Sequence, residues 1–166
     1  PRTSSAASDV YKRQDKYKDV FLNLEIKSTP IKDNLTPNPE EMVSLILKDI
    51  KEHKLEDRTL ITSYDWRILY ELKKQNSNIL RGFITLQQGL TTTGKNIYEN
   101  SPWMVKNYPL EELFLLPNII KSLEGHVWSV FYRDVTKQNV ELAHKHGLAT
   151  CVWTVNREQD IIRMIE

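Results

Sequence analysis

Hydrophobic and polar residues alternate along residues 20–27 (VFLNLEIK). The polar positions share one parity and the aliphatic positions the other, namely Asn23, Glu25 and Lys27 against Leu22, Leu24 and Ile26. A β-strand here therefore has one polar and one apolar face. In a parallel barrel with outer helices, Glu25 and Lys27 would point into the barrel mouth. Taken alone, the pattern equally allows a solvated face carrying a surface ion pair worth about 0–1 kcal/mol.

Similar patterns predict four more strands, with helices between them. The predicted strands cover residues 59–63, 79–86, 126–131 and 148–154. Longer helices are predicted to follow four residues that can act as N-caps: Asn38, Asp65, Thr136 and Asn156. A shorter helix is predicted over 117–123. Because strands and helices alternate, the predicted fold class is α/β with a parallel sheet.

Two further segments complete the expected organisation of the chain. Residues 87–116 contain Pro102, Pro109 and several aromatics, and they predict an insertion with a short helix around 110–116. Its aromatics, Tyr98, Trp103 and Tyr108, are expected to anchor the insertion, with a binding rim as the alternative. In the last helix, Ile161, Ile162 and Ile165 are expected to face inward.

Residues 1–14 (PRTSSAASDVYKRQ) show no hydrophobic periodicity. They are Ser/Ala-rich and then basic, and they adjoin the first strand without a turn signal. We interpret them as a non-native, disordered read-through segment, which leaves residues 15–166 as the domain.

Composition excludes several kinds of function. The net charge is +1 and the basic residues are scattered, so no nucleic-acid partner is expected. The single cysteine, Cys151, excludes an internal disulfide and a cysteine-based zinc site. No apolar run approaches the roughly 18 residues of a membrane span. No signal peptide is visible, but the sequence predicts neither a cytoplasmic nor an exported location.

The histidines do not suggest catalysis. His144 and His146 are two apart on a predicted helix, so they point in different directions and cannot share a metal. His53 is near a helix end and His126 begins a strand, which is the stability end of a barrel. The sequence also has no glycine-rich phosphate loop and no G-x-S-x-G elbow.

Polar and aromatic residues at the carboxyl ends of the predicted strands are the better candidates. Glu25 offers a hard oxygen ligand for Ca²⁺ or Mg²⁺, and Lys27 could neutralise a phosphate beside it. Ser63 lies at the end of the second strand. Trp153 could form an apolar wall for a substrate or fill the barrel.

Three ordered motifs carry a resemblance to a known family. LNLEIKS (22–28), LITSYDWR (60–67) and GLATCVWTVN (147–156) resemble the central and late motifs of the glycerophosphodiester phosphodiesterase family. The segments 133–136 (RDVT) and 143–147 (AHKHG) also look like the stretch preceding the family's Trp-Thr-Val-Asn. The resemblance covers residues 18–166.

The resemblance implies part of a TIM (β/α)₈ barrel, with about five consecutive βα units corresponding to strands 3–7. It also implies metal-dependent hydrolysis of small glycerophosphodiesters to glycerol 3-phosphate and an alcohol, with Ca²⁺ or Mg²⁺ as cofactor. Glu25 matches the family's metal-ligand glutamate, Lys27 its phosphate-contacting lysine, and Trp153 the tryptophan of its substrate-pocket motif. Ser63 and Asp65 lie in a recurring motif to which we assign no chemical role.

The sequence departs from the family at both ends. The family's opening motifs, His-Arg, Glu-x-Asp and His-Asp on its first two strands, supply acid/base histidines and further metal carboxylates. No strand with such motifs precedes LNLEIKS, and no final strand motif follows. We therefore expect a reading frame truncated at both ends, with no catalytic histidine, poor metal affinity and no activity of its own. Open sheet edges at the first and last strands are expected to promote self-association.

Two alternatives remain open at this stage. One is a natural half-barrel that serves as a non-catalytic binding or assembly module. The other is a related barrel phosphodiesterase of the phospholipase type, such as a phosphoinositide-specific or sphingomyelinase-D-like enzyme, which would share the architecture.

Overall fold

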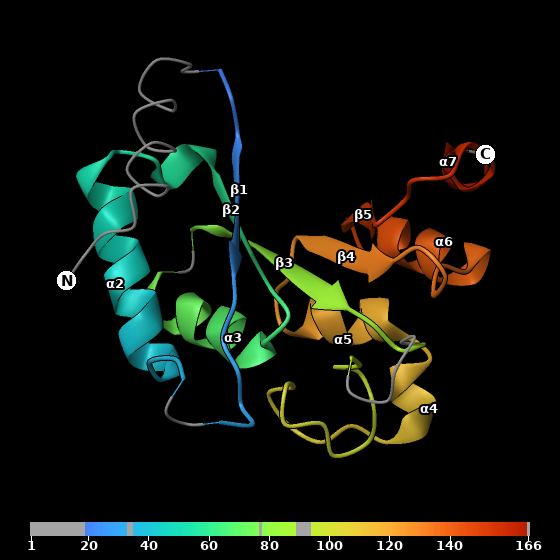
Figure 1. Ribbon diagram of the computed structural model, residues 1–166, viewed down its shortest axis with the longest axis horizontal. Helices are drawn as coiled ribbons and strands as arrows, with labels where there is room; N and C mark the ends of the chain where they lie inside the picture. The colour runs from blue at the N-terminus through green and yellow to red at the C-terminus, as the bar shows by residue number, and fades with distance from the viewer. Residues whose placement is uncertain (1–18, 33–34, 77, 89–93, 166) are drawn as a thin grey trace.

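The structure is a computed structural model that describes residues 19–32, 35–76, 78–88 and 94–165. Its centre is one parallel sheet of five strands in the order β1-β2-β3-β4-β5 (Figure 1). The strands are β1 (Leu22–Ile26), β2 (Thr59–Ser63), β3 (Leu80–Thr85), β4 (Val127–Phe131) and β5 (Ala149–Trp153). Each strand pairs with the next one along the chain, so the predicted succession of βα units is confirmed.

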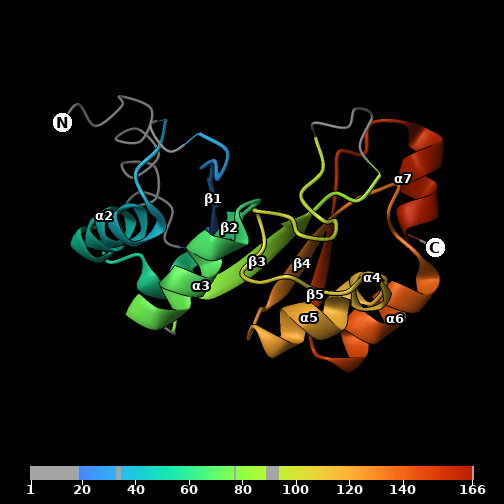
Figure 2. The ribbon, with the colours of Figure 1, turned by 90° about the horizontal axis from the view of Figure 1, so that it is seen from below.

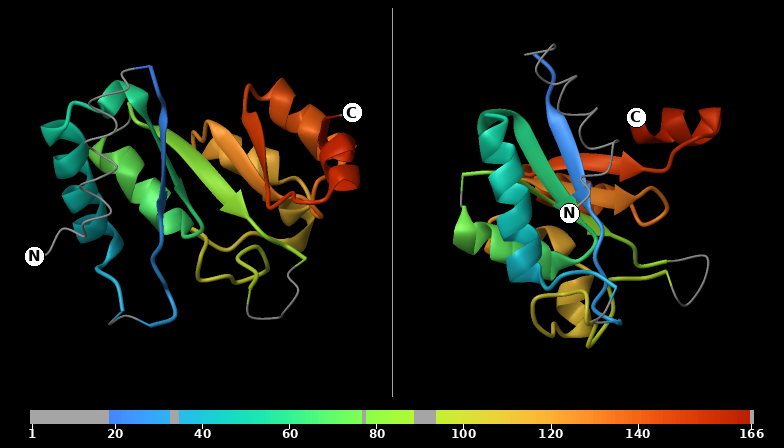
Figure 3. Two further views of the ribbon diagram at one scale, coloured as in Figure 1. Left: turned by 45° about the horizontal axis from the view of Figure 1, so that its top comes forward. Right: turned by 60° about the vertical axis from the view of Figure 1, so that its left-hand side comes forward.

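Helices lie along one face of this sheet. The helices of the described residues are α2 (Pro39–Glu52), α3 (Trp66–Gln75), α4 (Leu110–Leu113), α5 (Leu116–Ser122), α6 (Lys137–Lys145) and α7 (Glu158–Ile165), with a 3-10 turn η1 (Glu56–Arg58) before β2. Figure 2 shows α3, α5 and α6 along the same side of the strands. Strands β1 and β5 are the two edges, with the other three between them (Figure 3).

The predicted N-caps explain where three helices begin. The side chain of Asn38 accepts a 2.9 Å hydrogen bond from the Glu41 amide, and Pro39 takes the first helical position of α2. Asp65 caps α3 in the same way, and Thr136 accepts a 3.2 Å hydrogen bond from the Asn139 amide at the start of α6. All three predictions are confirmed.

The two faces of β1 are separated as its sequence predicts. Leu22 and Ile26 are each 7% exposed and belong to the same buried cluster as Val43 of α2. Asn23 and Glu25, on the other face, are exposed. The strand therefore presents its polar side chains on the face that the helices do not cover.

Helix α7 corrects one prediction. Ile161, Ile162 and Ile165 do not face inward but are 43%, 49% and 81% exposed. The helix also begins at Glu158 rather than directly after Asn156. Its half-buried apolar residue is Met164, which lines a groove together with Val152 of β5. The isoleucine side of α7 is therefore largely exposed in the described part of the chain.

The remaining segments are only partly described. The helix predicted around 110–116 is present as the single turn α4, with α5 starting at Leu116. The predicted read-through segment 1–14 and part of the predicted insertion, residues 89–93, lie outside the described residues. Within the described part of the chain, no helix combines the length and hydrophobicity that crossing a membrane requires.

Candidate functional site

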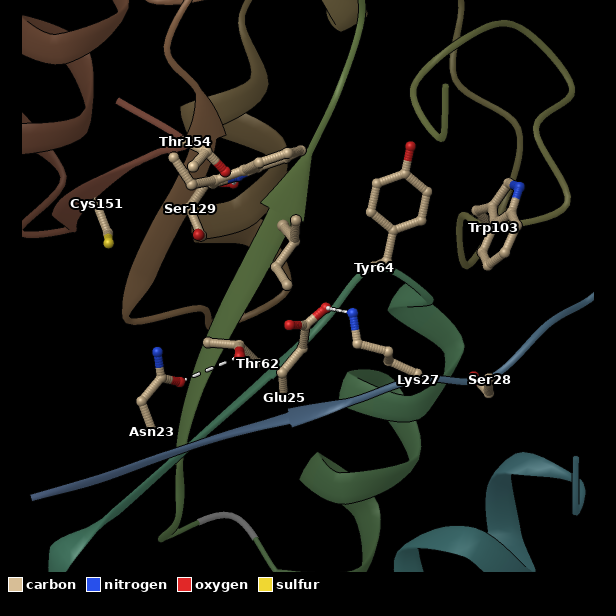
Figure 4. A pocket seen from close by; sticks show the side chains of 12 residues that line it. Asn23, Glu25, Lys27, Ser28, Thr62, Tyr64, Trp103, Ser129, Cys151 and Thr154 are labelled. Carbon is tan, nitrogen blue, oxygen red and sulfur yellow. Dashed lines mark hydrogen bonds and ion pairs between the residues drawn. The ribbon is translucent and has the colours of Figure 1, made fainter. Parts of the chain in front are cut away.

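A cavity of about 710 Å³ lies against the uncovered face of the sheet, and all five strands contribute to it (Figure 4). The residues that line it are Asn23, Glu25, Lys27, Ser28, Thr62, Tyr64, Ile84, Trp103, Ser129, Cys151, Trp153 and Thr154. Several of them lie at or just beyond the carboxyl ends of strands, where parallel barrels place their chemistry. The structure thus brings the three predicted site residues, Glu25, Lys27 and Trp153, to one cavity.

Glu25 and Lys27 form an ion pair inside this cavity. The Lys27 Nζ is 3.2 Å from the Glu25 Oε1 (Figure 4), and the two side chains are 82% and 43% exposed for lysine and glutamate respectively. An ion pair this accessible adds little to stability. Both groups are accordingly available to a ligand, which leaves their roles as phosphate contact and metal ligand as predictions.

Trp153 is held in a defined orientation. Its indole Nε1 donates a 3.2 Å hydrogen bond to the Ser129 carbonyl, and its ring centroid is 5.3 Å from that of Phe131. The side chain is half-buried and lines the cavity. A fixed aromatic surface can serve as one wall for a ligand's carbon skeleton.

Two residues without an assigned role, Ser63 and Asp65, support the end of β1. The Ser63 hydroxyl donates a 2.9 Å hydrogen bond to the Ile26 carbonyl and accepts one of 3.1 Å from the Asp65 amide. Both serine and aspartate are completely buried. Through these contacts the last residue of β1 is joined to the beginning of α3.

The Asp65 carboxylate extends this connection to the loop that carries Lys27. It accepts a 2.8 Å hydrogen bond from the Ser28 hydroxyl and two from the Arg67 guanidinium, at 2.9 and 2.7 Å. A bidentate guanidinium contact fixes the carboxylate in one plane. The loop residue next to Lys27 is therefore positioned by a buried charge.

Tyr64 and Trp103 are cavity residues that sequence reasoning did not select. Their rings meet edge to face with centroids 5.2 Å apart, and the Tyr64 hydroxyl donates to the Gly94 carbonyl. Burial, with the nearby Asp134 carboxylate, raises the pKa of the Tyr64 phenol above its ordinary value, so the ring stays neutral. The parity of Tyr64 with Thr62 could have indicated it, but no local signal indicates Trp103.

The insertion is anchored where it leaves β3. Asn96 donates hydrogen bonds of 2.8 Å to the carbonyls of Tyr64 and Ile84 and accepts one of 2.9 Å from the Leu86 amide. Asn96 is completely buried. Of the predicted anchoring aromatics, Tyr108 is 5% exposed. Trp103 packs against Tyr64 and also lines the cavity. It therefore fits both the predicted anchoring role and the alternative, a binding rim.

The described residues do not by themselves form a site for Ca²⁺ or Mg²⁺. Glu25 is the one carboxylate among the described residues that line the cavity, and the Lys27 ammonium is beside it. Within the described ranges there is no cluster of three or more His, Cys, Asp or Glu that could hold a metal ion. Since Ca²⁺ takes 6–8 oxygen ligands, Glu25 fits such an ion as one ligand only.

The histidines lie away from the cavity. His53 Nδ1 is 2.9 Å from the Asp49 carbonyl, and His146 Nε2 is 2.6 Å from the Asn118 side-chain oxygen. His126 Nδ1 accepts a 3.2 Å hydrogen bond from the Arg81 amide. Burial lowers the pKa of His126, and the adjacent Arg81 charge lowers it further. None of the four lines the cavity among the described residues.

Comparison with known proteins adds independent findings. A family model described as the glycerophosphoryl diester phosphodiesterase family matches residues 7–166. The glycerophosphodiester phosphodiesterase of Caldanaerobacter subterraneus subsp. tengcongensis is 29% identical over 149 residues, which cover 90% of this chain and 49% of that protein.

Solved structures agree with the fold. A Silicibacter pomeroyi protein assigned as a glycerophosphoryl diester phosphodiesterase has a TM-score of 0.72 and 28% identity, over 95% of this chain and 48% of its own. An Oleispira antarctica phosphodiesterase, solved in complex with the product sn-glycerol-3-phosphate, has a TM-score of 0.59 and 17% identity, over 87% and 47%. The chain spans about half the length of these relatives.

Proposed function

Because the chain belongs to the glycerophosphoryl diester phosphodiesterase family, we propose that the whole enzyme to which it corresponds hydrolyses glycerophosphodiesters to glycerol 3-phosphate and an alcohol. We propose further that this chain supplies the phosphate- and glycerol-binding part of the site. The observation that carries the proposal is the convergence of Glu25, Lys27 and Trp153 on one cavity at the carboxyl ends of the strands. The phosphodiesterase from Oleispira antarctica, whose fold is similar, binds sn-glycerol-3-phosphate as product.

Lys27 is the proposed phosphate contact. Its ammonium carries three donors on a flexible stem and is 82% exposed toward the cavity. The Glu25 carboxylate, 3.2 Å away, restrains it. Trp153 forms the proposed wall for the glycerol carbons, because its ring is held by the Ser129 carbonyl.

Glu25 is also the proposed ligand for a divalent cation, Ca²⁺ or Mg²⁺. Such an ion, when bound, would polarise the phosphoryl oxygens. A single carboxylate leaves most of the coordination shell to other groups. We therefore propose that the 166-residue chain holds the ion weakly and does not turn over substrate, since no described histidine lines the cavity for proton transfer.

A non-catalytic binding or assembly module is the second candidate function. The same observation favours it: the described cavity has a charged pair and aromatic walls but no acid/base histidine. A phospholipase-type phosphodiesterase is the third, and the products of the whole enzyme would separate it from the first. The open edges at β1 and β5 lead us to propose self-association as well.

Calorimetric titration of the chain with sn-glycerol 3-phosphate tests the proposed binding function. We expect measurable binding that falls about 10-fold or more in Lys27→Met, because a hydrogen bond to a charged group is lost. Lys32→Met is the matched control, since Lys32 is exposed and does not line the cavity. Equal affinity in the two variants would contradict the role of Lys27.

An activity assay separates the enzyme from the binding module. The chain is incubated with glycerophosphocholine, with and without Ca²⁺ or Mg²⁺, and release of glycerol 3-phosphate is measured. We expect none from this chain. Metal-dependent turnover by the chain alone would show that it is an enzyme in its own right and would overturn the proposed division of the site.

A further inference from the structure

Two aromatic side chains of the cavity, Tyr64 and Trp103, have no part in the binding roles described above. Figure 4 shows them together beside Lys27, whereas Ser129, Cys151 and Thr154 lie on the other side of the Glu25–Lys27 pair. Trp153 belongs to that second group through its hydrogen bond to the Ser129 carbonyl. The proposed phosphate contact thus has an aromatic surface on each side, which suits a phosphodiester because its phosphate carries two alcohol arms.

The wall formed by Tyr64 and Trp103 is built into the fold. The Trp103 carbonyl accepts a 2.9 Å hydrogen bond from the Trp66 amide at the start of α3. The Tyr64 carbonyl accepts one of 2.8 Å from the buried Asn96 side chain. With the rings in edge-to-face contact at 81°, the wall needs little ordering when a ligand arrives.

This wall offers mainly aromatic surface. The Tyr64 hydroxyl donates to the Gly94 carbonyl, so its proton is already used, and the Trp103 indole N–H is the wall's other donor. A polyol such as inositol would lose water from several hydroxyls and recover few partners on this wall. A quaternary ammonium group needs no hydrogen bond and is attracted to aromatic faces.

The charges of the cavity favour the same group. Among the described residues that line it, Glu25 and Lys27 are the charged ones, and without a divalent cation at Glu25 they neutralise each other. A bound phosphodiester adds one negative charge. A cationic alcohol arm supplies the missing positive charge within the same ligand.

We propose that Tyr64 and Trp103 form the subsite for the alcohol arm of the phosphodiester and that this subsite selects a quaternary ammonium alcohol over a polyol. The proposal rests on the proposed function, because it takes Lys27 as the phosphate contact. It adds a substrate preference and two residues that determine it.

The test compares three ligands by calorimetry on the 166-residue chain in EDTA: glycerophosphocholine, glycerophosphoinositol and sn-glycerol 3-phosphate. We expect glycerophosphocholine to bind about 5-fold or more tightly than glycerophosphoinositol, as a desolvated cation–π contact gives. Trp103→Leu is expected to remove this preference and to leave the affinity for sn-glycerol 3-phosphate within about 2-fold.

Further variants keep the test decisive. Trp103→Phe keeps an aromatic face and is expected to retain part of the preference, and Tyr64→Leu is expected to lose it. Phe114→Leu is the control, because Phe114 is 63% exposed and does not line the cavity. Where a variant does not fold, the affinities of the unsubstituted chain for glycerophosphocholine and glycerophosphoinositol still test the proposed preference.

The outcomes separate this inference from the proposed function. Equal affinity for glycerophosphocholine and glycerophosphoinositol, with sn-glycerol 3-phosphate still bound, overturns the subsite alone. A preference that survives in both Trp103→Leu and Tyr64→Leu does the same. Failure of all three ligands to bind overturns the proposed function and the subsite together.

Discussion

The hydroxyl of Ser28 donates a 2.8 Å hydrogen bond to the carboxylate of Asp65, 37 residues further along the chain. Ser28 follows Lys27 directly, and Asp65 is the completely buried N-cap of α3. The bond therefore connects the loop that carries the proposed phosphate contact to a rigid helix start. Asp65, which is not among the residues that line the cavity, therefore positions the Lys27 loop through Ser28.

Ser28→Ala is predicted to weaken ligand binding more than it weakens the fold. Loss of one part-buried hydrogen bond costs about 0.5–1.5 kcal/mol of stability. The freed loop should lower the affinity for sn-glycerol 3-phosphate by about 3-fold or more, because Lys27 is less well placed. Calorimetry and urea denaturation measure the two effects.

Ser44→Ala provides the matched control for that variant. The Ser44 hydroxyl donates a 2.9 Å hydrogen bond to the Gln75 side chain, but the serine is exposed on α2 and does not line the cavity. It should leave ligand affinity unchanged. If Ser28→Ala and Ser44→Ala bind the ligand equally well, the Ser28–Asp65 bond does not position the loop.

Asp65→Ala is predicted to destabilise the fold by about 2–4 kcal/mol. It removes a helix cap worth about 1 kcal/mol and leaves the Arg67 guanidinium and the Ser28 hydroxyl without their partner carboxylate. Asp65→Asn keeps an oxygen that can accept the capping hydrogen bond, so its loss of stability should be smaller. Urea denaturation provides the measurement, and a change below about 0.5 kcal/mol for the alanine variant would contradict it.

The elements that could be predicted from the sequence follow local rules. The two faces of β1 follow from strand geometry, and the caps Asn38, Asp65 and Thr136 follow from the need to satisfy the first amides of a helix. Each of these depends on neighbouring residues in the chain. The same holds for Glu25, whose strand face is given by its parity.

The features that could not be predicted depend on contacts between distant segments. Trp103 reaches the cavity because its carbonyl binds the Trp66 amide and its ring meets Tyr64, and no pattern around residue 103 encodes this. The isoleucines of α7 illustrate the opposite case. Their spacing indicates an amphipathic helix, but spacing does not say whether anything covers the apolar side.

His126 gives a prediction for the pH dependence of stability. Burial and the Arg81 charge lower its pKa below the ordinary value of 6.5. The unfolded chain therefore binds a proton at this histidine more readily than the folded one, so the contribution of neutral His126 to stability is complete above about pH 6.5 and is lost as the pH falls. Urea denaturation between about pH 7.5 and pH 5 should show this decline.

His126→Asn tests whether that histidine is the cause. An asparagine oxygen can replace Nδ1 as acceptor for the Arg81 amide and carries no titratable proton. The decline below about pH 6.5 should become shallower in this variant. His144→Asn serves as the control, because His144 is exposed on α6. An unchanged slope in His126→Asn would assign the pH dependence to other groups.

The exposed side of α7 is predicted to promote self-association, together with the outer edges of β1 and β5, the end strands of the described sheet. Ile161, Ile162 and Ile165 form an apolar stripe on one short helix, and β1 and β5 have no further strand beside them among the described residues. We expect sedimentation velocity to show species larger than a monomer at micromolar concentration. The double substitution Ile162→Lys and Ile165→Lys should shift the distribution toward monomer, because a charged helix face resists burial.

A matched double variant separates this stripe from a general effect of added charge. Asn156→Lys and Gln159→Lys add the same two positive charges at exposed polar positions just before and on the helix, and they should leave the distribution as in the wild type. If both double variants dissociate the assemblies equally, charge repulsion is responsible and the stripe is not the contact. A single sharp monomer boundary for the wild-type chain, with a cooperative melt, would contradict self-association itself. If the isoleucine variant dissociates only in part, the edges of β1 and β5 remain as the second contact, because their backbone groups are unchanged by substitutions on α7.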